Sequence, residues 1–248
     1  MEYRELGKTG MKISRLGFGG IPIQRIDAEG TKALAQKLLD AGVNYIDTAR
    51  GYTVSEKYLG YALEGVRDKF ILATKGRGLT REAMEADVAA SLRDLRTDYV
   101  DLYQFHNPSM ENLEKITAPG GALEALRDAK AAGTVRHIGV TAHSAEVFEK
   151  ALTMDWVETI MFPYNIVENQ GAELMEKCRE RGTGFICMKP LAGGAIDDAT
   201  LALRYIIQNP AVTVVIPGMA APKELAQNLA AVSDNSPLSD AELAKIQV

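Results

Sequence analysis

The sequence predicts an α/β fold, a (β/α)8 TIM barrel that begins with a short β-hairpin. Three observations support this: eight short apolar segments recur along the 248 residues, amphipathic helical patterns separate them, and three helical patterns end in glycine just before a strand. Near-continuous apolarity is typical of strands buried on both faces of a parallel sheet. Barrels of this kind commonly form one unit of about 200–250 residues, so we expect a single domain over residues 1–248.

The expected hairpin comes first, with strands at residues 2–6 and 12–14 around the turn Gly-Lys-Thr-Gly. Eight barrel strands then follow, each rich in apolar or aromatic residues and flanked by Gly or Pro. They are expected at residues 15–20, 44–49, 70–75, 99–106, 137–142, 159–165, 184–190 and 213–218.

Between the strands, apolar residues at three- and four-residue steps predict amphipathic helices, with clear examples at 31–42, 81–95 and 172–182. Gly42, Gly133 and Gly182 would each supply the left-handed residue that ends a helix before the next strand. Ser144 is the expected N-cap of a helix over 145–152. Residues 107–121, after the fourth strand, read as the longest irregular stretch and as a specificity loop or flap.

An open, doubly wound sheet is the alternative fold. It would be favoured by a G-x-G-x-x-G motif after the first strand, but the sequence there is GFGGIP, which lacks this spacing. The net charge of −5 and the absence of a basic tract give no reason to expect nucleic acid or a membrane as partner. The first ten residues lack an apolar signal core, so we expect a cytoplasmic protein.

Cys178 and Cys187 are the two cysteines, too few for a four-cysteine zinc or iron–sulfur site. Both are expected to be buried thiols. The candidate site residues also lack the spacing typical of metal ligands, and we expect no metal site.

Three polar residues stand at the carboxyl ends of successive strands: Asp47, Lys75 and His106. Tyr52 follows in the loop after the first of them. The carboxyl ends of barrel strands face the active site, so these four side chains are expected to meet there. Each residue alone is weak evidence, since a strand-terminal Asp or Lys commonly caps a loop or is solvated.

Together the four side chains make a coherent chemical set. A lysine cation beside a tyrosine lowers the phenol pKa, and Asp47 would hold that cation in place. His106 would donate a hydrogen bond to a carbonyl oxygen while Tyr52 gives it a proton. An aldolase that forms a Schiff base at Lys75 is an alternative, which pairing of the lysine with Asp47 disfavours.

From about residue 2 to residue 232 the chain resembles the aldo-keto reductases. The opening YRELGKTGMKISRLGFGG, then IDTARGY, ATKGR, DLYQFHNP and IPGMAAPKELAQNL carry the resemblance. It implies that Tyr52 is the general acid and that Lys75, Asp47 and His106 complete the catalytic set. MKPLAGG and PYNIVENQG look most like a prokaryotic subset, here in a short form without the cysteine-rich, ferredoxin-like tail and the long C-terminal substrate loop.

The resemblance also implies a nicotinamide dinucleotide bound without a Rossmann fold. The cofactor contacts it implies are Gly19, Gly20, Asp47, Thr141, Met188, Lys189, Pro190, Leu191, Gly193, Ile216, Gly218, Lys223, Gln227 and Asn228. Several ring contacts depart from the family pattern: Thr141-Ala142 replaces a Ser-Asn pair, Met161 replaces a Gln, and Met188 replaces a stacking Tyr.

The choice between the two nicotinamide cofactors depends on the segment after the eighth strand. Ala220 and Glu224 stand where family members that prefer the 2′-phosphate usually place arginine, and Lys223 is the nearby cation. A carboxylate there would repel a phosphate. We expect NADPH, with NADH as the alternative.

The leading functional hypothesis is an NAD(P)H-dependent reductase that converts the carbonyl of a small aldehyde or ketone into an alcohol. A redox sensor that binds the cofactor but turns over slowly is the alternative, motivated by the altered ring contacts and the missing substrate loop. His143 is placed to reach the substrate pocket. His137, at the other end of the same strand, is expected to be structural, and Trp156 to serve packing.

Overall fold

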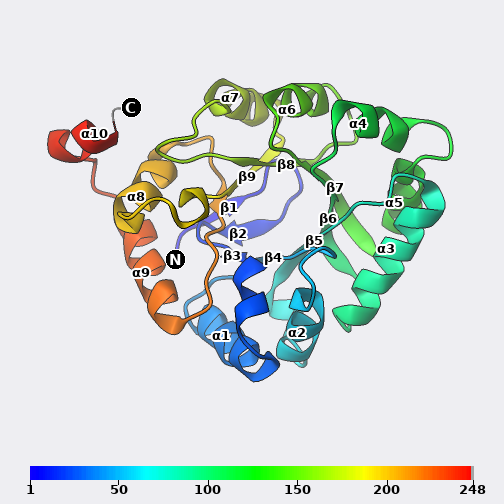
Figure 1. Cartoon of the computed structure of the whole chain (residues 1–248), viewed down its shortest axis with the longest axis horizontal. Coiled ribbons are helices and arrows are strands. Elements are labelled where there is room, and N and C mark those ends of the chain that lie inside the picture. Colours follow the sequence, from blue (N-terminus) through cyan, green and yellow to red (C-terminus); the bar gives the residue numbers. More distant parts are fainter. Residues whose placement is uncertain (247–248) are drawn as a thin grey trace.

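Eight parallel strands form a closed barrel in the computed structural model, which describes residues 1–246 (Figure 1). In order around the barrel they are β3 (Phe18–Gly19), β4 (Tyr45–Asp47), β5 (Ile71–Gly76), β6 (Val100–His106), β7 (Val135–Thr141), β8 (Thr159–Pro163), β9 (Gly184–Met188) and β10 (Val214–Val215). Parallel bridges from Leu16 to Val215 and from Gly19 to Gly218 join the last strand to the first. The predicted (β/α)8 barrel is therefore confirmed.

The N-terminal hairpin closes one end of this barrel. Its strands β1 (Tyr3–Glu5) and β2 (Lys12–Ser14) pair antiparallel, as predicted, and lie across the middle of the ring in Figure 1. Leu6 and Ile13 are fully buried and pack into the apolar cluster inside the barrel. The hairpin therefore covers the amino-terminal ends of the strands and leaves the carboxyl-terminal ends accessible.

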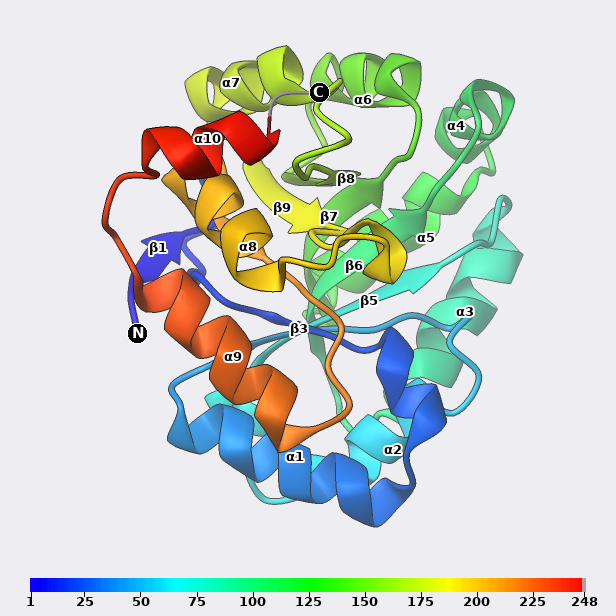
Figure 2. The ribbon, with the colours of Figure 1, turned by 60° about the vertical axis from the view of Figure 1, so that its left-hand side comes forward.

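Helices surround the strands, with α1, α2 and α9 on one side and α6 and α7 on the other (Figure 2). Their bounds are α1 (Ala28–Asp40), α2 (Ser55–Ala62), α3 (Arg81–Asp94), α4 (Met110–Thr117), α5 (Ala122–Ala131), α6 (Ala145–Leu152), α7 (Ala172–Arg181), α8 (Ala199–Gln208), α9 (Pro222–Ser233) and α10 (Asp240–Ile246). Three short 3-10 helices, η1 (Ile21–Arg25), η2 (Arg67–Lys69) and η3 (Ala192–Gly194), lie in the loops.

Glycine ends three of the helices, as predicted. Gly42, Gly133 and Gly182 have φ angles of +74°, +79° and +77°, a conformation that costs glycine little. Ser144 occupies the N-cap position of α6, but its side chain makes no capping hydrogen bond. The local signals therefore located these helix ends correctly, whereas the hydrogen bond expected of Ser144 did not form.

The prediction that residues 107–121 are irregular was wrong, because they contain α4. Ser109 caps this helix, and its hydroxyl accepts a hydrogen bond of 3.1 Å from the backbone amide of Asn112. Leu113 and Ile116 are buried at the three-residue spacing of an amphipathic helix. The segment therefore contains an ordered helix beside the barrel mouth.

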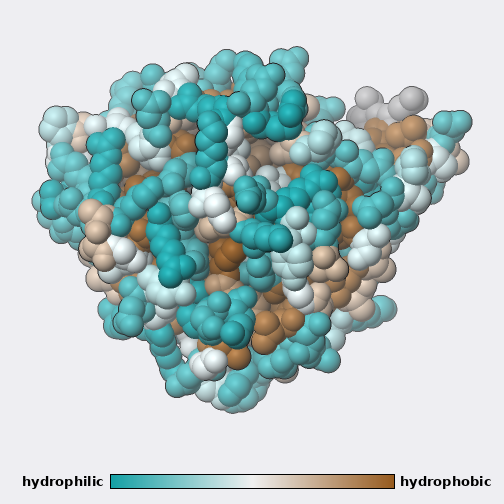
Figure 3. Space-filling view, turned by 180° about the vertical axis from the view of Figure 1, so that it is seen from behind, coloured by the Kyte–Doolittle hydropathy of each residue, from teal (hydrophilic) through white to brown (hydrophobic). Residues whose placement is uncertain are grey.

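The interior is apolar and the surface is largely polar. On the face seen from behind Figure 1, hydrophilic residues predominate and hydrophobic ones show in small separate areas (Figure 3). Both cysteines are buried, as predicted, and burial raises the pKa of the Cys178 thiol to about 12. No helix in the described range is long and apolar enough to span a bilayer. One domain over residues 1–248 stays a prediction, since residues 247–248 lie outside that range.

Candidate active site at the carboxyl ends of the strands

Strand alternation decides which side chains reach the barrel interior. Inward-facing residues of three neighbouring strands form one buried apolar layer, made of Tyr45, Ala73 and Leu102. Successive side chains of a strand point to opposite faces, so the residue two positions further on faces inward again. The next inward layer is therefore polar and consists of Asp47, Lys75 and Gln104, followed on β6 by His106.

The structure brings the four predicted residues together. The Lys75 Nζ atom donates to Asp47 Oδ2 at 2.6 Å and to the backbone oxygen of Thr48 at 2.7 Å, and it lies 3.4 Å from the Tyr52 hydroxyl oxygen. The rings of Tyr52 and His106 meet edge to face, with centroids 5.9 Å apart. We refer to Asp47, Tyr52, Lys75 and His106 as the tetrad.

A tight turn after β4 delivers Tyr52 to this position. The backbone amide of Tyr52 donates to Ala49 at 3.0 Å, and the amide of Ser55 donates to the Tyr52 carbonyl at 2.8 Å. Thr48 and Ser55 are joined through their hydroxyl groups at 2.8 Å. These bonds fold the loop back over the barrel mouth, so that the phenol lies above the lysine.

The loop is also anchored by charged groups that the sequence did not reveal. Glu56, in the first turn of α2, accepts a hydrogen bond of 2.6 Å from the Thr74 hydroxyl. Arg50 pairs with Glu56 and, at 2.9 Å, with Asp94 of α3. The Arg50 amide also donates to the Lys75 carbonyl. This network ties the Tyr52 loop to the strand that carries Lys75.

Lys75 and Asp47 form a buried ion pair. Their side chains are 1% and 3% exposed. Burial raises the pKa of the Asp47 carboxyl. Burial by itself would lower the pKa of Lys75, but the charge of Asp47 and the contacts with Asp47 and Tyr52 outweigh burial, so the net pKa of Lys75 is raised and the group stays an ammonium.

The pKa of Tyr52 differs from the sequence-based expectation. Lys75 does act to lower it, as predicted, but burial acts more strongly in the opposite direction and the charge of Asp47 adds to burial. The net pKa is therefore above the ordinary value. At neutral pH the side chain is a phenol that holds its proton, the form that a proton donor requires.

His106 is held in its neutral form. Burial and the positive charges of Lys75 and Arg77 lower its pKa to about 3. Its Nδ1 atom is buried without a hydrogen-bond partner among the described residues. A proton on Nε2 would leave only a lone pair unpaired at Nδ1, and the ring would then donate through Nε2.

Gln104 is a site residue that the sequence analysis missed. Its Nε2 atom donates to Asp47 Oδ1 at 3.1 Å, so Asp47 is held on one oxygen by Gln104 and on the other by Lys75. The signal was present in DLYQFH, where Gln104 stands two residues before His106 and so shares its face of the strand.

The residues predicted to contact a cofactor lie on the same end of the barrel. Gly19 bridges Gly218, Thr141 pairs with His106 across β6 and β7, and Gly20 donates its amide to the Asp47 carbonyl. The others end β9, follow β9 or β10, or lie on α9. Among them Ile216 points its side chain into the barrel interior and Asn228 is buried. The remaining ones are Met188, Lys189, Pro190, Leu191, Gly193, Lys223 and Gln227.

This rim has exposed backbone and a free hydroxyl donor that a ligand could reach. A Cβ atom added at Gly193 would meet no described atom within 4 Å, so the backbone is open to close approach by a ligand. Thr141 Oγ1 accepts the Asn107 amide at 2.9 Å and keeps its own proton to donate. The nearby Asn165 side chain, unlike Thr141, is fully engaged within the protein. Its oxygen accepts from the amides of Val167 and Glu168, and its nitrogen donates to Glu168 and to the Lys189 carbonyl.

Glu224 occupies the start of α9. Its Oε2 atom accepts hydrogen bonds from the backbone amides of Ala220, at 2.6 Å, and Ala221, at 3.0 Å. These amides lie at the helix N-terminus, where an anion would otherwise be favoured. The carboxylate therefore fills a position that could receive a phosphate.

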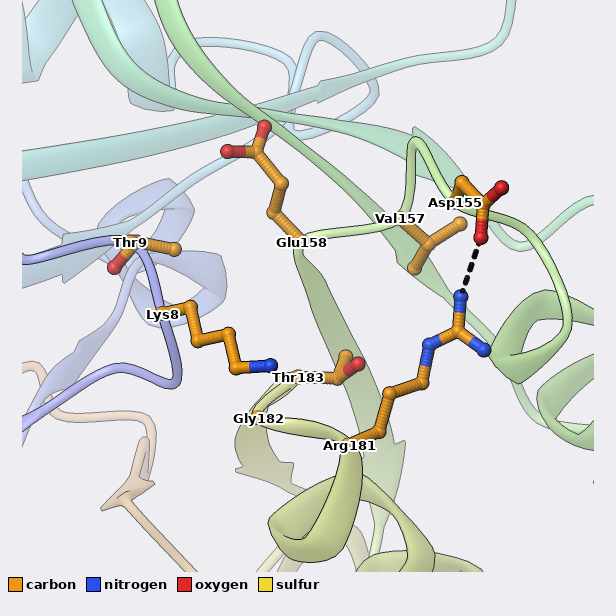
Figure 4. A pocket seen from close by; sticks show the side chains of 8 residues that line it. All are labelled: Lys8, Thr9, Asp155, Val157, Glu158, Arg181, Gly182 and Thr183. Carbon is orange, nitrogen blue, oxygen red and sulfur yellow. Dashed lines mark hydrogen bonds and ion pairs between the residues drawn. The ribbon is translucent and has the colours of Figure 1, made fainter.

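A hollow of about 390 Å³ lies at the opposite end of the barrel (Figure 4). Arg181 pairs there with Asp155 at 3.1 Å, and Lys8 reaches in from the hairpin. Glu158 pairs with His137 at 2.7 Å, and the structural role of that histidine stays a prediction. The hollow is lined by residues that precede β8 and β9, so it lies far from the tetrad.

Comparison with known proteins agrees with the fold. The sequence profile of the Aldo/keto reductase family matches residues 15–200 and 196–248. Together with the barrel, this match places the protein among the oxidoreductases. The chain belongs to the aldo-keto reductase family, as the sequence motifs predicted.

Individual relatives cover most of the chain. It is 27% identical to L-galactose dehydrogenase of Arabidopsis thaliana over 94% of this chain and 89% of that protein. It is 26% identical to the NADH-specific methylglyoxal reductase of Escherichia coli over 98% of this chain and 96% of that protein. Among solved structures, the holo form of aldo-keto reductase AKR11C1 from Bacillus halodurans has a TM-score of 0.87 at 26% identity, covering 99% and 95% of the two chains.

Proposed function

We propose that this chain reduces the carbonyl group of small aldehydes or ketones to an alcohol, with a nicotinamide dinucleotide as reductant. The observation that supports this most directly is the Lys75 Nζ atom 3.4 Å from the Tyr52 hydroxyl, in a loop that also places the His106 ring against the phenol. One position at the barrel mouth is then faced by three groups: the Tyr52 phenol as proton donor, the Lys75 ammonium beside it, and the neutral His106 ring as hydrogen-bond donor.

Tyr52 is the proton donor in this scheme. A nicotinamide dinucleotide, when bound, would supply the hydride for the carbonyl carbon, so that negative charge would develop on the carbonyl oxygen. His106, neutral because its pKa is about 3, donates a hydrogen bond to that oxygen. Tyr52 delivers its proton to the same oxygen, and the Lys75 ammonium stabilises the phenolate that forms.

Asp47 and Gln104 act through the lysine. Asp47 keeps Lys75 protonated, and Gln104 fixes the second carboxylate oxygen. A retained ammonium cannot attack a carbonyl, so the ion pair gives no support to a Schiff-base aldolase. The anchored Tyr52 loop likewise gives no support to a sensor that only binds the cofactor.

For the cofactor we propose NADH as well as NADPH, with the preference on the side of NADH. The sequence favoured NADPH, but Glu224 places its negative charge on the amides at the start of α9. A 2′-phosphate brought to this segment would meet that charge, whereas a ribose hydroxyl could donate a hydrogen bond to it. The name of the Escherichia coli relative, an NADH-specific reductase, is consistent with this.

Tyr52→Phe tests the proposal, since it removes the proton and little else. We expect turnover of a panel of aldehydes and ketones to fall by about 10²–10⁴-fold, the usual contribution of a positioned general acid. Cofactor affinity, measured by fluorescence titration, should stay unchanged. Tyr61→Phe, on the outside of α2, is the matched control. Full activity of Tyr52→Phe would rule out the assigned role, and a wild-type protein that oxidises neither cofactor with any carbonyl would rule out the function.

A further inference from the structure

A cavity of about 400 Å³ opens beside His106, between the ends of β5 and β6 and helix α4. Its lining includes Leu79, Phe105 and Ile116 as apolar groups and His106, Asn107 and Asn112 as polar ones. Because His106 belongs both to the tetrad and to this lining, a molecule whose carbonyl reaches the tetrad can extend into the cavity.

Among the described residues that line this cavity, Arg77 is the one with a charged side chain. It lies two residues after Lys75, and the ion pairs found within residues 1–246 include Lys75 and Arg81 but not Arg77. Among the described residues, its guanidinium therefore makes no ion pair within 4 Å, although the Asp87 carboxylate accepts a hydrogen bond from the Arg77 backbone amide, and it lies at the edge of a partly apolar cavity.

The backbone that carries Arg77 is fixed in place. The amides of Arg77 and Gly78 donate to Asp87 Oδ2 at 3.0 and 2.9 Å. A Cβ atom at Gly76 would lie 2.7 Å from the Tyr103 hydroxyl and 2.8 Å from the Asp87 carboxylate, so the chain passes close to α3 there. The Arg77 side chain thus extends from a turn whose backbone is fixed by hydrogen bonds to Asp87.

The charge of Arg77 also reaches the tetrad. It contributes to lowering the pKa of His106, and it acts in the same direction on the pKa of Tyr52. Beside it, Asn107 has the left-handed φ of +53° and uses its Oδ1 atom to accept the His143 amide at 3.0 Å. This orientation leaves the Asn107 Nδ2 group as a donor near the same cavity.

We propose that this cavity binds the anionic end of the substrate, and that the preferred substrates are aldehydes or ketones that carry a carboxylate. The inference rests on the proposed carbonyl reduction and adds its substrate class. The planar guanidinium of Arg77 would bind the carboxylate with two parallel hydrogen bonds. Leu79, the apolar lining residue that is partly exposed, would contact the carbon chain between the carboxylate and the reacting carbonyl.

Succinic semialdehyde and its methyl ester provide the test, because they differ by one charge. We expect the wild-type protein to have the higher kcat/KM for the acid. Arg77→Gln should lower kcat/KM for the acid by about 10–100-fold, mainly through KM, as expected for a hydrogen bond to a charged group. The ester should lose less kcat/KM than the acid, so the preference for the acid should fall, and Arg77→Lys should keep part of that preference. A loss common to both substrates measures the effect of Arg77 on the tetrad. Arg127→Gln, on the outside of α5, is the matched control.

The outcomes separate this inference from the proposed function. Equal reduction of acid and ester by the wild type would overturn the inference and leave the function standing. An equal loss on both substrates in Arg77→Gln would also overturn it, because Arg77 would then act only through the tetrad and not on the carboxylate. If neither compound is reduced, calorimetry with succinate decides: saturable binding that Arg77→Gln abolishes supports the site, and its absence overturns it.

Discussion

Replacing Lys75 with methionine would leave Asp47 as a buried carboxylate without its cation. The Asp47 side chain is 3% exposed, and within residues 1–246 the Gln104 amide would be its remaining side-chain partner. Removing one partner of a buried pair costs about 3–5 kcal/mol, because the other charge stays desolvated. A typical domain has only about 5–15 kcal/mol of unfolding free energy.

The double variant Asp47→Asn with Lys75→Met isolates the cause. It removes both charges, and an asparagine can still accept the hydrogen bond from Gln104. Replacing a whole buried pair by neutral groups is often close to neutral, so the double variant should regain most of the lost stability. Lys115→Met breaks the exposed pair with Glu111 and serves as control, with an expected cost of at most about 1 kcal/mol.

Urea unfolding followed by circular dichroism and by Trp156 fluorescence measures these differences, provided that the m-values agree. The loss in Lys75→Met should also depend on pH. Without its cation, Asp47 would have a folded-state pKa raised further above the unfolded value, so the penalty is full at neutral pH. It should shrink as pH falls through the folded pKa.

Two results would refute this reasoning. A cost below about 1 kcal/mol in Lys75→Met would mean that the carboxylate is not effectively buried. A double variant as unstable as the sum of the two single variants would mean that the residues do not interact. In both cases the tetrad would be less tightly organised than the 2.6 Å contact indicates.

Two further predictions concern protons and the cofactor. Because His106 has a pKa of about 3, the pH profile of kcat/KM should show no acid limb from this ring between pH 5 and 8. A limb near pH 6.5 that disappears in His106→Asn or His106→Gln would contradict this. Glu224→Gln removes one negative charge at α9, worth about 1 kcal/mol at 4 Å in water. Fluorescence titrations should therefore show the NADPH to NADH affinity ratio rising by about fivefold, and an unchanged ratio would refute the role of Glu224.

The sequence by itself determined the barrel and the positions of the tetrad. Short, near-continuous apolar strands, amphipathic helices and the glycines at 42, 133 and 182 are local signals, and each depends on a few neighbouring residues. In a parallel barrel all strands end on the same side, so polar residues at three successive strand ends had to meet. The amphipathic spacing of α4 was present as well, and was missed because Pro and Gly flank it.

Only the tertiary structure decided how these groups act on one another. Gln104 reaches Asp47 across β5, and Glu224 turns back onto the amides of Ala220 and Ala221. The net pKa of Tyr52 is raised, since burial outweighs the nearby Lys75. Burial, strand register and the direction of a side chain depend on residues far apart in the sequence, and a local pattern does not encode them.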